Sequence, residues 1–345
     1  MPIYIYPDRI EFPNYSLRID STGVRVTTPT VTKTSGTFTT VGSILTIANQ
    51  GVTRGYASGG ANTSFSTTLN VIDQYPFATN ANATDVGDLT QIRQSAAGAS
   101  SSVSGYSSGG FTPPPTVSNV IDKFPFAANA NATDVGDLTQ IRGRPAGQSS
   151  SVSGYSSGGF IPLPVAPMGP YRSDRIDKFP FSTNANATTV GNLSQMRGGS
   201  AAQSSLYAGY TSGGDPNAPA VNTIDTFPYA SDTNASDVGD LSSASANIAG
   251  HSSSVSGYSS GLGTVGIDKF PFATRSNAAS IGSISQARSV VTGTSSTTNG
   301  YTQGGYNFPN LSYNTIDRFP FATDASSSDV GDLTVARWGT AAQQY

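Results

Sequence analysis

The chain has 345 residues, a formal net charge of −3, and charged side chains at only 11% of its positions. It has no cysteine, which excludes a disulfide framework and a thiolate nucleophile. Four Lys and 14 Arg against 20 Asp and one Glu give no basic excess, so we expect no nucleic-acid partner.

Glycine and hydroxyl side chains dominate the sequence, with 38 Gly and long Ser/Thr-rich runs. Apolar residues do not recur at helical spacing, which favours many short strands and an all-β fold. No stretch approaches the ~18 consecutive apolar residues of a membrane span, and the N-terminus lacks the pattern of a signal peptide. We therefore expect no membrane insertion and no secretory leader.

The first 50 residues belong to no repeat and form a separate N-terminal arm. Apolar residues alternate at Leu17 and Ile19 and again at Val24 and Val26, which predicts two or three short strands. A segment of this size cannot bury much of itself, so we expect it to anchor the chain to another protein. Docking of the arm on the rest of its own chain is the alternative. The side chains expected to make the anchoring contacts are Tyr4, Tyr6, Phe12, Tyr15 and Arg18.

Residues 51–345 consist of six copies of one unit, and such a period determines the architecture. A phrase Ile-Asp-x-Phe/Tyr-Pro-Phe/Tyr recurs at spacings of 43 to 55 residues. Its isoleucines are Ile72, Ile121, Ile176, Ile224, Ile267 and Ile316. A Gly-Tyr-x-Ser/Gln-Gly or related phrase precedes every copy, as at Gly105. Six units of this length predict a six-bladed β-propeller.

Each unit is expected to form four strands. In the second unit, the small residues of 96–103 suit an innermost strand beside a central channel. Residues 105–109 and 120–126 are the next two predicted strands, and the second of these ends at a proline. Residues 134–137 are expected to form a turn that leads into a short fourth strand at 138–141.

The two ends of the repeat region complement each other. The last eight residues, 338–345, match an innermost strand, but no glycine-tyrosine strand follows them. The first unit has its other three strands and lacks this one. We therefore predict that the C-terminal strand pairs with the strand at Gly55 and closes the ring, which removes exposed sheet edges.

The order of these features resembles the kelch repeat over roughly residues 50–345. Arg, a Gly-Gly pair, a variable loop, Asn-x-Ile-Asp-x-Phe and Leu-Thr-x-x-Arg follow one another at kelch-like spacing. The tryptophan usual before the fourth kelch strand is absent, and Asp-Val-Gly-Asp-Leu replaces it. The wording Ile-Asp-Lys-Phe-Pro-Phe-Ala resembles repeats in virion and tail-fibre proteins of marine bacteriophages, cyanophages especially, which implies a place in a phage particle.

The sequence is poor in groups that catalyse reactions. It holds one histidine, His251, in a predicted innermost strand, where a packed or channel-facing role is favoured over catalysis. We expect no enzyme activity and no cofactor. The Asp-x-Gly-Asp segments could hold calcium, but Asn192 and Ser283 replace the second aspartate in two units. Carboxylates accepting backbone hydrogen bonds are the favoured interpretation, and we predict no required metal.

Binding residues are expected where the repeats differ, between the Gly-Gly pair and the Ile-Asp phrase. This segment is longest in the third unit, where it carries apolar residues, a tyrosine and two arginines. A tolerated insertion stiffened by proline is the alternative interpretation. The expected interaction residues are Phe111, Phe160, Leu163, Met168, Tyr171, Arg172, Arg175, Tyr306, Phe308 and Tyr313.

These features predict a non-enzymatic structural protein of a phage virion, in the tail, fibre or collar. The expected partners are other virion proteins, further copies of the chain, and a protein or glycan on the host surface. A carbohydrate-binding module for host glycans is the second hypothesis, and a capsid decoration protein is a variant of the first.

Overall fold

A computed structural model describes the backbone of four strands before residue 28. It describes backbone and side chains at 50–62, 67–113, 116–162, 171–263, 265–307 and 311–345. These residues form strands and loops without a helix, which confirms the all-β class. The search for an apolar helix long enough to cross a membrane accordingly finds none in this part of the chain. The chain divides into two compact units, Met1–Thr46 and Ile47–Tyr345.

The N-terminal unit contains an antiparallel sheet of four consecutive strands. These are β1 (Tyr4–Ile5), β2 (Arg9–Phe12), β3 (Tyr15–Asp20) and β4 (Gly23–Thr27). The predicted alternation appears in the register, where Leu17 pairs with Val26 and Ile19 with Val24. The sequence predicted two or three strands, and the additional one arises because β2 pairs with both β1 and β3. Tyr6 and the side chains of the other predicted anchoring residues lie outside the described part.

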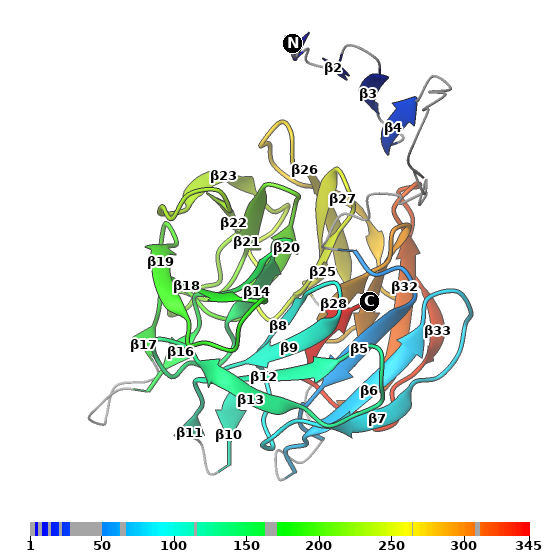
Figure 1. Ribbon diagram of the computed structural model, residues 1–345. Helices are drawn as coiled ribbons and strands as arrows, with labels where there is room; N and C mark the ends of the chain where they lie inside the picture. Colours follow the sequence, from blue (N-terminus) through cyan, green and yellow to red (C-terminus); the bar gives the residue numbers. More distant parts are fainter. Residues whose placement is uncertain are drawn as a thin grey trace, which may run out of the picture. The chain divides into compact units, whose positions relative to one another are not determined.

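The second unit is a six-bladed β-propeller, as predicted (Figure 1). Each blade is a four-stranded antiparallel sheet. The innermost strands are β34 (Ala341–Gln344), β8 (Ala97–Ser100), β14 (Ala146–Ser149), β20 (Ala201–Ser204), β24 (Ala249–Ser252) and β28 (Thr292–Ser295). The second strands are β5 (Arg54–Ser58), β9 (Ser104–Ser108), β15 (Ser153–Ser157), β21 (Ala208–Ser212), β25 (Ser256–Leu262) and β29 (Asn299–Gln303).

The third strands carry the repeated Ile-Asp phrase, and the outer strands follow them. The third strands are β6 (Val71–Pro76), β12 (Val120–Pro125), β18 (Arg175–Pro180), β22 (Thr223–Pro228), β26 (Gly266–Pro271) and β32 (Thr315–Pro320). The outer strands are β7 (Thr84–Asp88), β13 (Thr133–Asp137), β19 (Thr188–Asn192), β23 (Ser236–Asp240), β27 (Ala279–Ser283) and β33 (Ser328–Asp332).

The position of the outer strand corrects the prediction from sequence. The Asp-x-Gly-Asp segment forms this strand itself, and residues 138–141 are a bend that follows it. Two contacts outside the blade hold the segment extended. The backbone N–H of Asp88 donates to Asn131 Oδ1 of the next blade at 3.0 Å, and that of Ala132 donates to the Asp88 carbonyl at 2.7 Å.

The C-terminal strand closes the ring as predicted. Strand β34 pairs with β5, with Gln344 opposite Gly55 and Ala341 opposite Ser58. The first blade is therefore built from both ends of the propeller sequence. This arrangement leaves the innermost position of every blade occupied and removes the open edge that an unclosed ring would present.

The blades pack through aromatic pairs that cross from one sheet to the next. Tyr106 in β9 stacks on Phe181, which follows β18 in the next blade, with ring centroids 4.8 Å apart. Tyr258 in β25 stacks on Phe321 beyond β32 in the same way, at 4.7 Å. The repeated Gly-Tyr and Phe-Pro-Phe phrases thus encode the contacts between blades, and such pairs add to the free energy gained by burial.

The two faces of the propeller differ. On one face, which we call the loop face, the second strands connect to the third strands. It carries three short hairpins. These are β10 (Phe111–Thr112) with β11 (Thr116–Val117), β16 (Phe160–Ile161) with β17 (Tyr171–Arg172), and β30 (Tyr306–Asn307) with β31 (Leu311–Ser312). On the opposite face, the turn face, short turns connect the innermost strands to the second strands.

Removing residues 341–345 tests the closure. We expect a large loss of stability, because blade one loses its innermost strand and two neighbouring blades lose a partner. Thermal denaturation followed by circular dichroism measures the change. A peptide of residues 338–345 added in trans should recover part of the lost melting temperature. A truncated chain that melts like the full chain would contradict closure by this strand.

Candidate functional site

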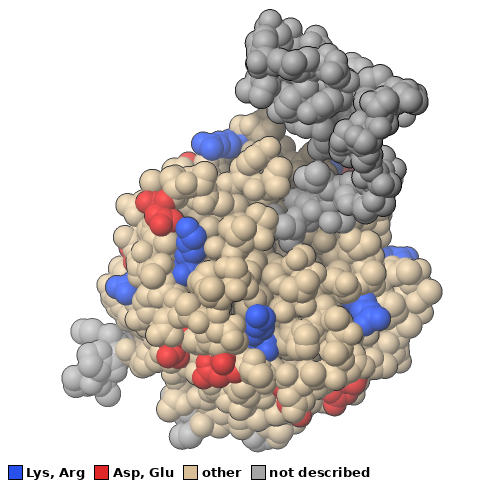
Figure 2. All heavy atoms as spheres, in the orientation of Figure 1, with Lys and Arg blue, Asp and Glu red and all other residues tan. Residues whose placement is uncertain are grey.

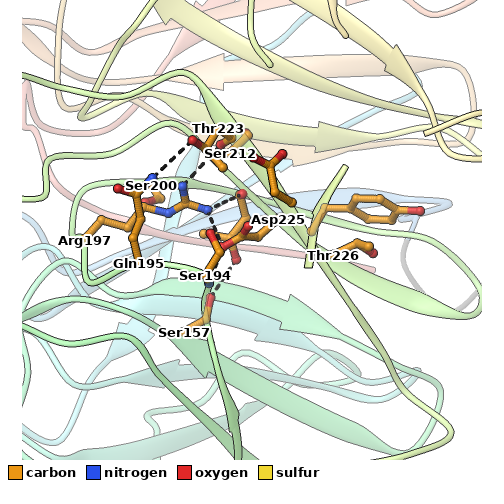
Figure 3. Close-up of polar contacts among 12 residues, drawn as sticks. Ser157, Ser194, Gln195, Arg197, Ser200, Ser212, Thr223, Asp225 and Thr226 are labelled. Atoms are coloured by element: carbon orange, nitrogen blue, oxygen red, sulfur yellow. Dashed lines mark hydrogen bonds and ion pairs between the residues drawn. The ribbon is translucent and has the colours of Figure 1, made fainter. Parts of the chain in front are cut away.

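Most buried ionisable groups hold the blades together. Arg197, which follows β19, reaches into the next blade and pairs with Asp225 of the Ile-Asp phrase at 2.9 Å (Figure 3). Both side chains are fully buried. The guanidinium also donates to the carbonyls of Thr211 and Thr223, and the carboxylate accepts the backbone N–H of Ser194. Burial lowers the pKa of Arg197, and the charge of Asp225 opposes this shift.

The same ion pair recurs between neighbouring blades around the ring. The other pairs are Arg93–Asp122, Arg142–Asp177, Arg288–Asp317 and Arg337–Asp73. Blade five differs, because Ser245 occupies the place of the arginine and Asp268 accepts hydrogen bonds from the N–H and hydroxyl of Ser242. The repeated aspartates of the Ile-Asp phrase are therefore structural.

His251 is a packed residue inside the propeller. Its ring is 1% exposed, with Nε2 2.8 Å from Ser260 Oγ and Nδ1 3.1 Å from the Thr294 carbonyl. Burial lowers its pKa to about 4, and the bond to the Thr294 carbonyl opposes the shift. Gln148 and Gln203 occupy the same position in blades three and four and bond to the equivalent serines. The single histidine is thus one variant of a repeated polar contact.

In the Asp-x-Gly-Asp segments, the first carboxylate accepts a hydrogen bond from the backbone of the same segment. Asp85 and Asp134 accept the backbone N–H two residues later, each at 3.1 Å, as predicted. The same bond forms at Asp237 and Asp329. No group of three or more histidine, aspartate or glutamate side chains suited to a metal occurs among the described residues.

A closed ring of backbone hydrogen bonds surrounds the channel mouth on the loop face. One residue from each blade donates its N–H to the carbonyl of its counterpart in the preceding blade, at 2.5–3.1 Å. All six have positive φ angles between 50° and 68°. They are Ser95, Arg144, Gly199, Asn247, Val290 and Gly339. Glycine suits this conformation best, so the arginine at this position is unusual.

Arg144 extends across the channel mouth. Its Nη1 donates to Asn247 Oδ1 at 2.9 Å, two blades away. Gly199, the residue between them in the ring, leaves the path open, because a Cβ there would lie 2.7 Å from Asn247 Oδ1. Arg144 Nε is buried and has no hydrogen-bond partner, and the side chain forms no ion pair with the described residues.

Two arginines flank Phe160 beside this mouth. The guanidinium carbon of Arg172 lies 4.5 Å from the ring centroid and that of Arg144 lies 5.7 Å from it. Arg172 pairs with Asp215 at 2.6 Å and also bonds to Asn217 Oδ1. Burial lowers the pKa of Arg144, whereas Tyr306 and Asp215 act in the opposite direction. The mouth therefore carries two positive charges and one negative charge.

The predicted interaction residues occupy the loop face in different environments. Phe111, Phe160 and Tyr306 begin the three hairpins, and Tyr171 is 47% exposed. Arg172 is buried in its ion pair, so it shapes the site more than it reaches outward. Arg175 bonds to Thr139 Oγ1, and Tyr313 follows β31 and is half-buried. Leu163, Met168 and Phe308 lie outside the described residues.

Sequence reasoning missed Arg144 and its partner Asn247. Both lie in segments expected to form small-residue strands, and neither stands in a variable loop. One signal was available: the other blades carry Ser95, Gly199, Val290 and Gly339 at this position, so a charged residue departs from the repeat. The position of the guanidinium over the channel follows only from the closed ring.

The visible surface carries few charges. Lys and Arg side chains lie separately between large uncharged areas, and Asp side chains form small groups (Figure 2). The described pairs Lys178–Asp232 and Lys269–Asp324 are partly exposed. Exposed ion pairs of this kind contribute little to stability. Most of the remaining polar surface consists of hydroxyl and amide groups.

Comparison of the sequence with protein-family models and with curated proteins finds no match. The fold therefore rests on the internal repeat and on the arrangement of the strands.

The Arg197→Met substitution tests the ion pair between blades. We expect a loss of about 3–5 kcal/mol in the free energy of unfolding, because Asp225 is left buried without its cationic partner. Urea denaturation measures the loss. The double variant Arg197→Met/Asp225→Asn should recover part of it, and Arg275→Met, at an exposed arginine, should change stability by less than about 1 kcal/mol. Equal losses in all three variants would contradict the assignment.

The His251→Gln substitution tests the buried histidine. Its pKa is about 4 in the folded chain, below the ordinary value of 6.5, so the unfolded chain binds the proton first as the pH falls. The native chain should lose up to about 3 kcal/mol of stability through this group between pH 6.5 and 4. Glutamine should remove this component while preserving stability at pH 7. Parallel stability curves for both proteins would contradict a depressed pKa.

Proposed function

We propose that this chain is a non-enzymatic structural protein of a bacteriophage particle, located in the tail, fibre or collar. In this proposal, the N-terminal arm anchors the subunit and the propeller presents its loop face to a neighbouring protein or to the host surface. The observation that carries the proposal is the difference between the two faces of the propeller.

The loop face combines variation with rigidity. Its hairpins differ in length and sequence between blades, whereas the strands beneath them repeat closely. Phe111, Tyr171 and Tyr306 are at least partly exposed there, and aromatic residues are common at the centres of protein interfaces. Variable segments on a rigid scaffold are a common basis of recognition.

The turn face offers a surface for attachment. Exposed apolar side chains occur at the turns of five blades, between 57% and 75% exposed. They are Val52, Val103, Val152, Tyr207 and Val255. The chain also enters the propeller on this face, where the Gly51 N–H donates to the Ser295 carbonyl. A propeller attached by this face would leave its hairpins accessible.

The non-enzymatic character is supported by the use of the ionisable side chains. Five arginine–aspartate pairs are buried between blades, and His251 is buried in a repeated polar contact. Two cavities at the axis are small, about 50 and 100 Å³. Their linings are dominated by glycine, alanine, serine and backbone groups, which offer little for acid–base chemistry.

The phage assignment rests on the amino-acid sequence of the repeats. The spacing of the Gly-Gly pair, the Ile-Asp strand and the closing arginine resembles kelch repeats, and the Ile-Asp-Lys-Phe-Pro-Phe phrase resembles virion proteins of marine phages. Glycan binding remains the second candidate. The aromatic rings nearest the mouth favour it less, because arginines cover Phe160 and Trp338 is only 3% exposed.

Deleting residues 1–49 tests the proposal. We expect a folded monomeric propeller by light scattering and circular dichroism, because the ring is closed without the arm, and loss of incorporation into the particle. A cryo-EM map of the particle containing the full chain should show the arm held by other structural proteins. Absence of the chain from the particle, or normal incorporation after the deletion, would refute the anchoring role.

A further inference from the structure

The strongest unexplained group in the propeller is the guanidinium of Arg144. Five other buried arginines have an aspartate partner within 3 Å, whereas Arg144 has none among the described residues. Its Nη1 donates to the neutral amide of Asn247, and its Nε is buried without an acceptor, as is the Nε of each of the five paired arginines. A largely buried charge without a counter-charge is unfavourable, so its retention calls for an explanation beyond stability.

Tyr306 and Asp215 raise the pKa of Arg144 against the effect of burial, but no carboxylate of the described residues forms an ion pair with it. Asp215, the carboxylate beside this cluster, is already engaged by Arg172 and by the backbone N–H groups of Asn217 and Ala218. The loop-face segments outside the described residues, 63–66, 114–115, 163–170, 264 and 308–310, contain no Asp or Glu. These segments therefore supply no further carboxylate.

A cavity lies directly beside this side chain. Arg144 lines it together with Ser95, Asn247, Ile248 and Thr340, and its volume is about 70 Å³. At about 10–15 Å³ for each water-sized occupant, it accommodates roughly five such groups. This is enough for a carboxylate and one or two methylenes but not for a whole hexose ring. The apolar edge of Ile248 suits the methylenes.

We propose that this mouth binds the carboxylate of an aspartate or glutamate side chain presented by a partner protein. A guanidinium holds a carboxylate with paired, charge-assisted hydrogen bonds, and the unsatisfied Nε–H of Arg144 provides one of the required donors. The Phe160 ring borders the guanidinium on one side, and the hydrogen bond to Asn247 holds its end.

A protein side chain fits this site better than an acidic sugar. A uronate would need an exposed aromatic face on which its ring could stack, and Phe160 is 8% exposed between its two arginines. The inference rests on the proposed function, since it names the chemistry by which the loop face contacts its partner.

The backbone conformation at Arg144 gives a way to separate binding from stability, although Ser95, Asn247 and Val290 adopt the same positive φ in their blades. Its φ is 50°, in the left-handed region that disfavours side chains, and blades four and one place Gly199 and Gly339 at the same position. Replacing Arg144 by glycine relieves this conformation and removes a buried charge. A residue kept only for stability would show the opposite effect.

The test is an NMR titration of the full-length chain, following arginine Nε–Hε signals at constant ionic strength. The probes are propionate, N-acetylglutamate α-amide, its neutral counterpart N-acetylglutamine amide, and galacturonate. We expect the Arg144 signal to shift saturably with the first two probes, and the glutamine compound to bind at least tenfold more weakly. The Arg144→Gly variant should lose this response and should melt at the same or a higher temperature.

Two further variants make the result decisive. Arg144→Asn introduces the residue that blade five carries at this position of the ring, Asn247. It serves in place of Arg144→Gly if the glycine variant fails to fold. Arg275→Gln, at an exposed arginine away from the mouth, should leave the response unchanged. Absence of a saturable shift, equal binding of the glutamine compound, or a lower melting temperature with an unchanged ligand response would overturn the proposal.

Tighter binding of galacturonate than of the glutamate compound would overturn the choice of a protein side chain. Failure of this inference is distinct from failure of the proposed function. An Arg144→Gly chain that is incorporated and contacts its partner normally overturns only the carboxylate site, whereas absence of the native chain from the particle overturns the function itself.

Discussion

The close approach of six backbones around one axis is the constraint on which the propeller depends. A Cβ added to Gly98 would lie 2.0 Å from the Ala342 carbonyl oxygen of the neighbouring blade. The equivalent positions therefore carry only glycine or alanine. At the turn-face end, each innermost strand donates a backbone N–H to a hydroxyl or amide oxygen of the next, at 2.8–3.0 Å. These hydrogen bonds need short polar side chains, which accounts for the serine-rich composition.

Buried ion pairs provide a second level of organisation. Arg197 and its counterparts satisfy carbonyls and a carboxylate at once, so each arginine fixes the register between two blades. Desolvation offsets much of the electrostatic gain of such pairs, so their clearest effect is to penalise arrangements that leave one partner alone. Blade five shows that the ring tolerates one exception, in which Asp268 keeps only the hydrogen bonds from Ser242 that its counterparts also receive in the other blades. Arg144 is the opposite case, a charge that has a neutral partner in Asn247 and no ion pair with a described carboxylate.

The repeat predicted the blades well because each phrase has one structural task. Tyr106 and Phe181 pack between blades, and the Ile-Asp phrase brings Asp225 to Arg197. The outer strand was predicted in the wrong place for a physical reason. Residues 134–137 carry the turn-forming Asp and Gly, and their extended conformation depends on hydrogen bonds from the next blade, such as Asp137 N–H to Asn186. Local propensity contains no information about such a partner.

The sequence by itself determined the fold class, the number of blades and the closure by residues 338–345, because repetition and a missing strand are properties of the order of residues. It also placed Phe160 and Tyr306 on one face, since variable segments occur at the same point of each unit. The tertiary structure alone decided that Arg144 reaches over the channel to Asn247 and forms no ion pair with the carboxylates that the structure describes. These residues are 103 positions apart, and only closing six blades into a ring brings their side chains across one mouth.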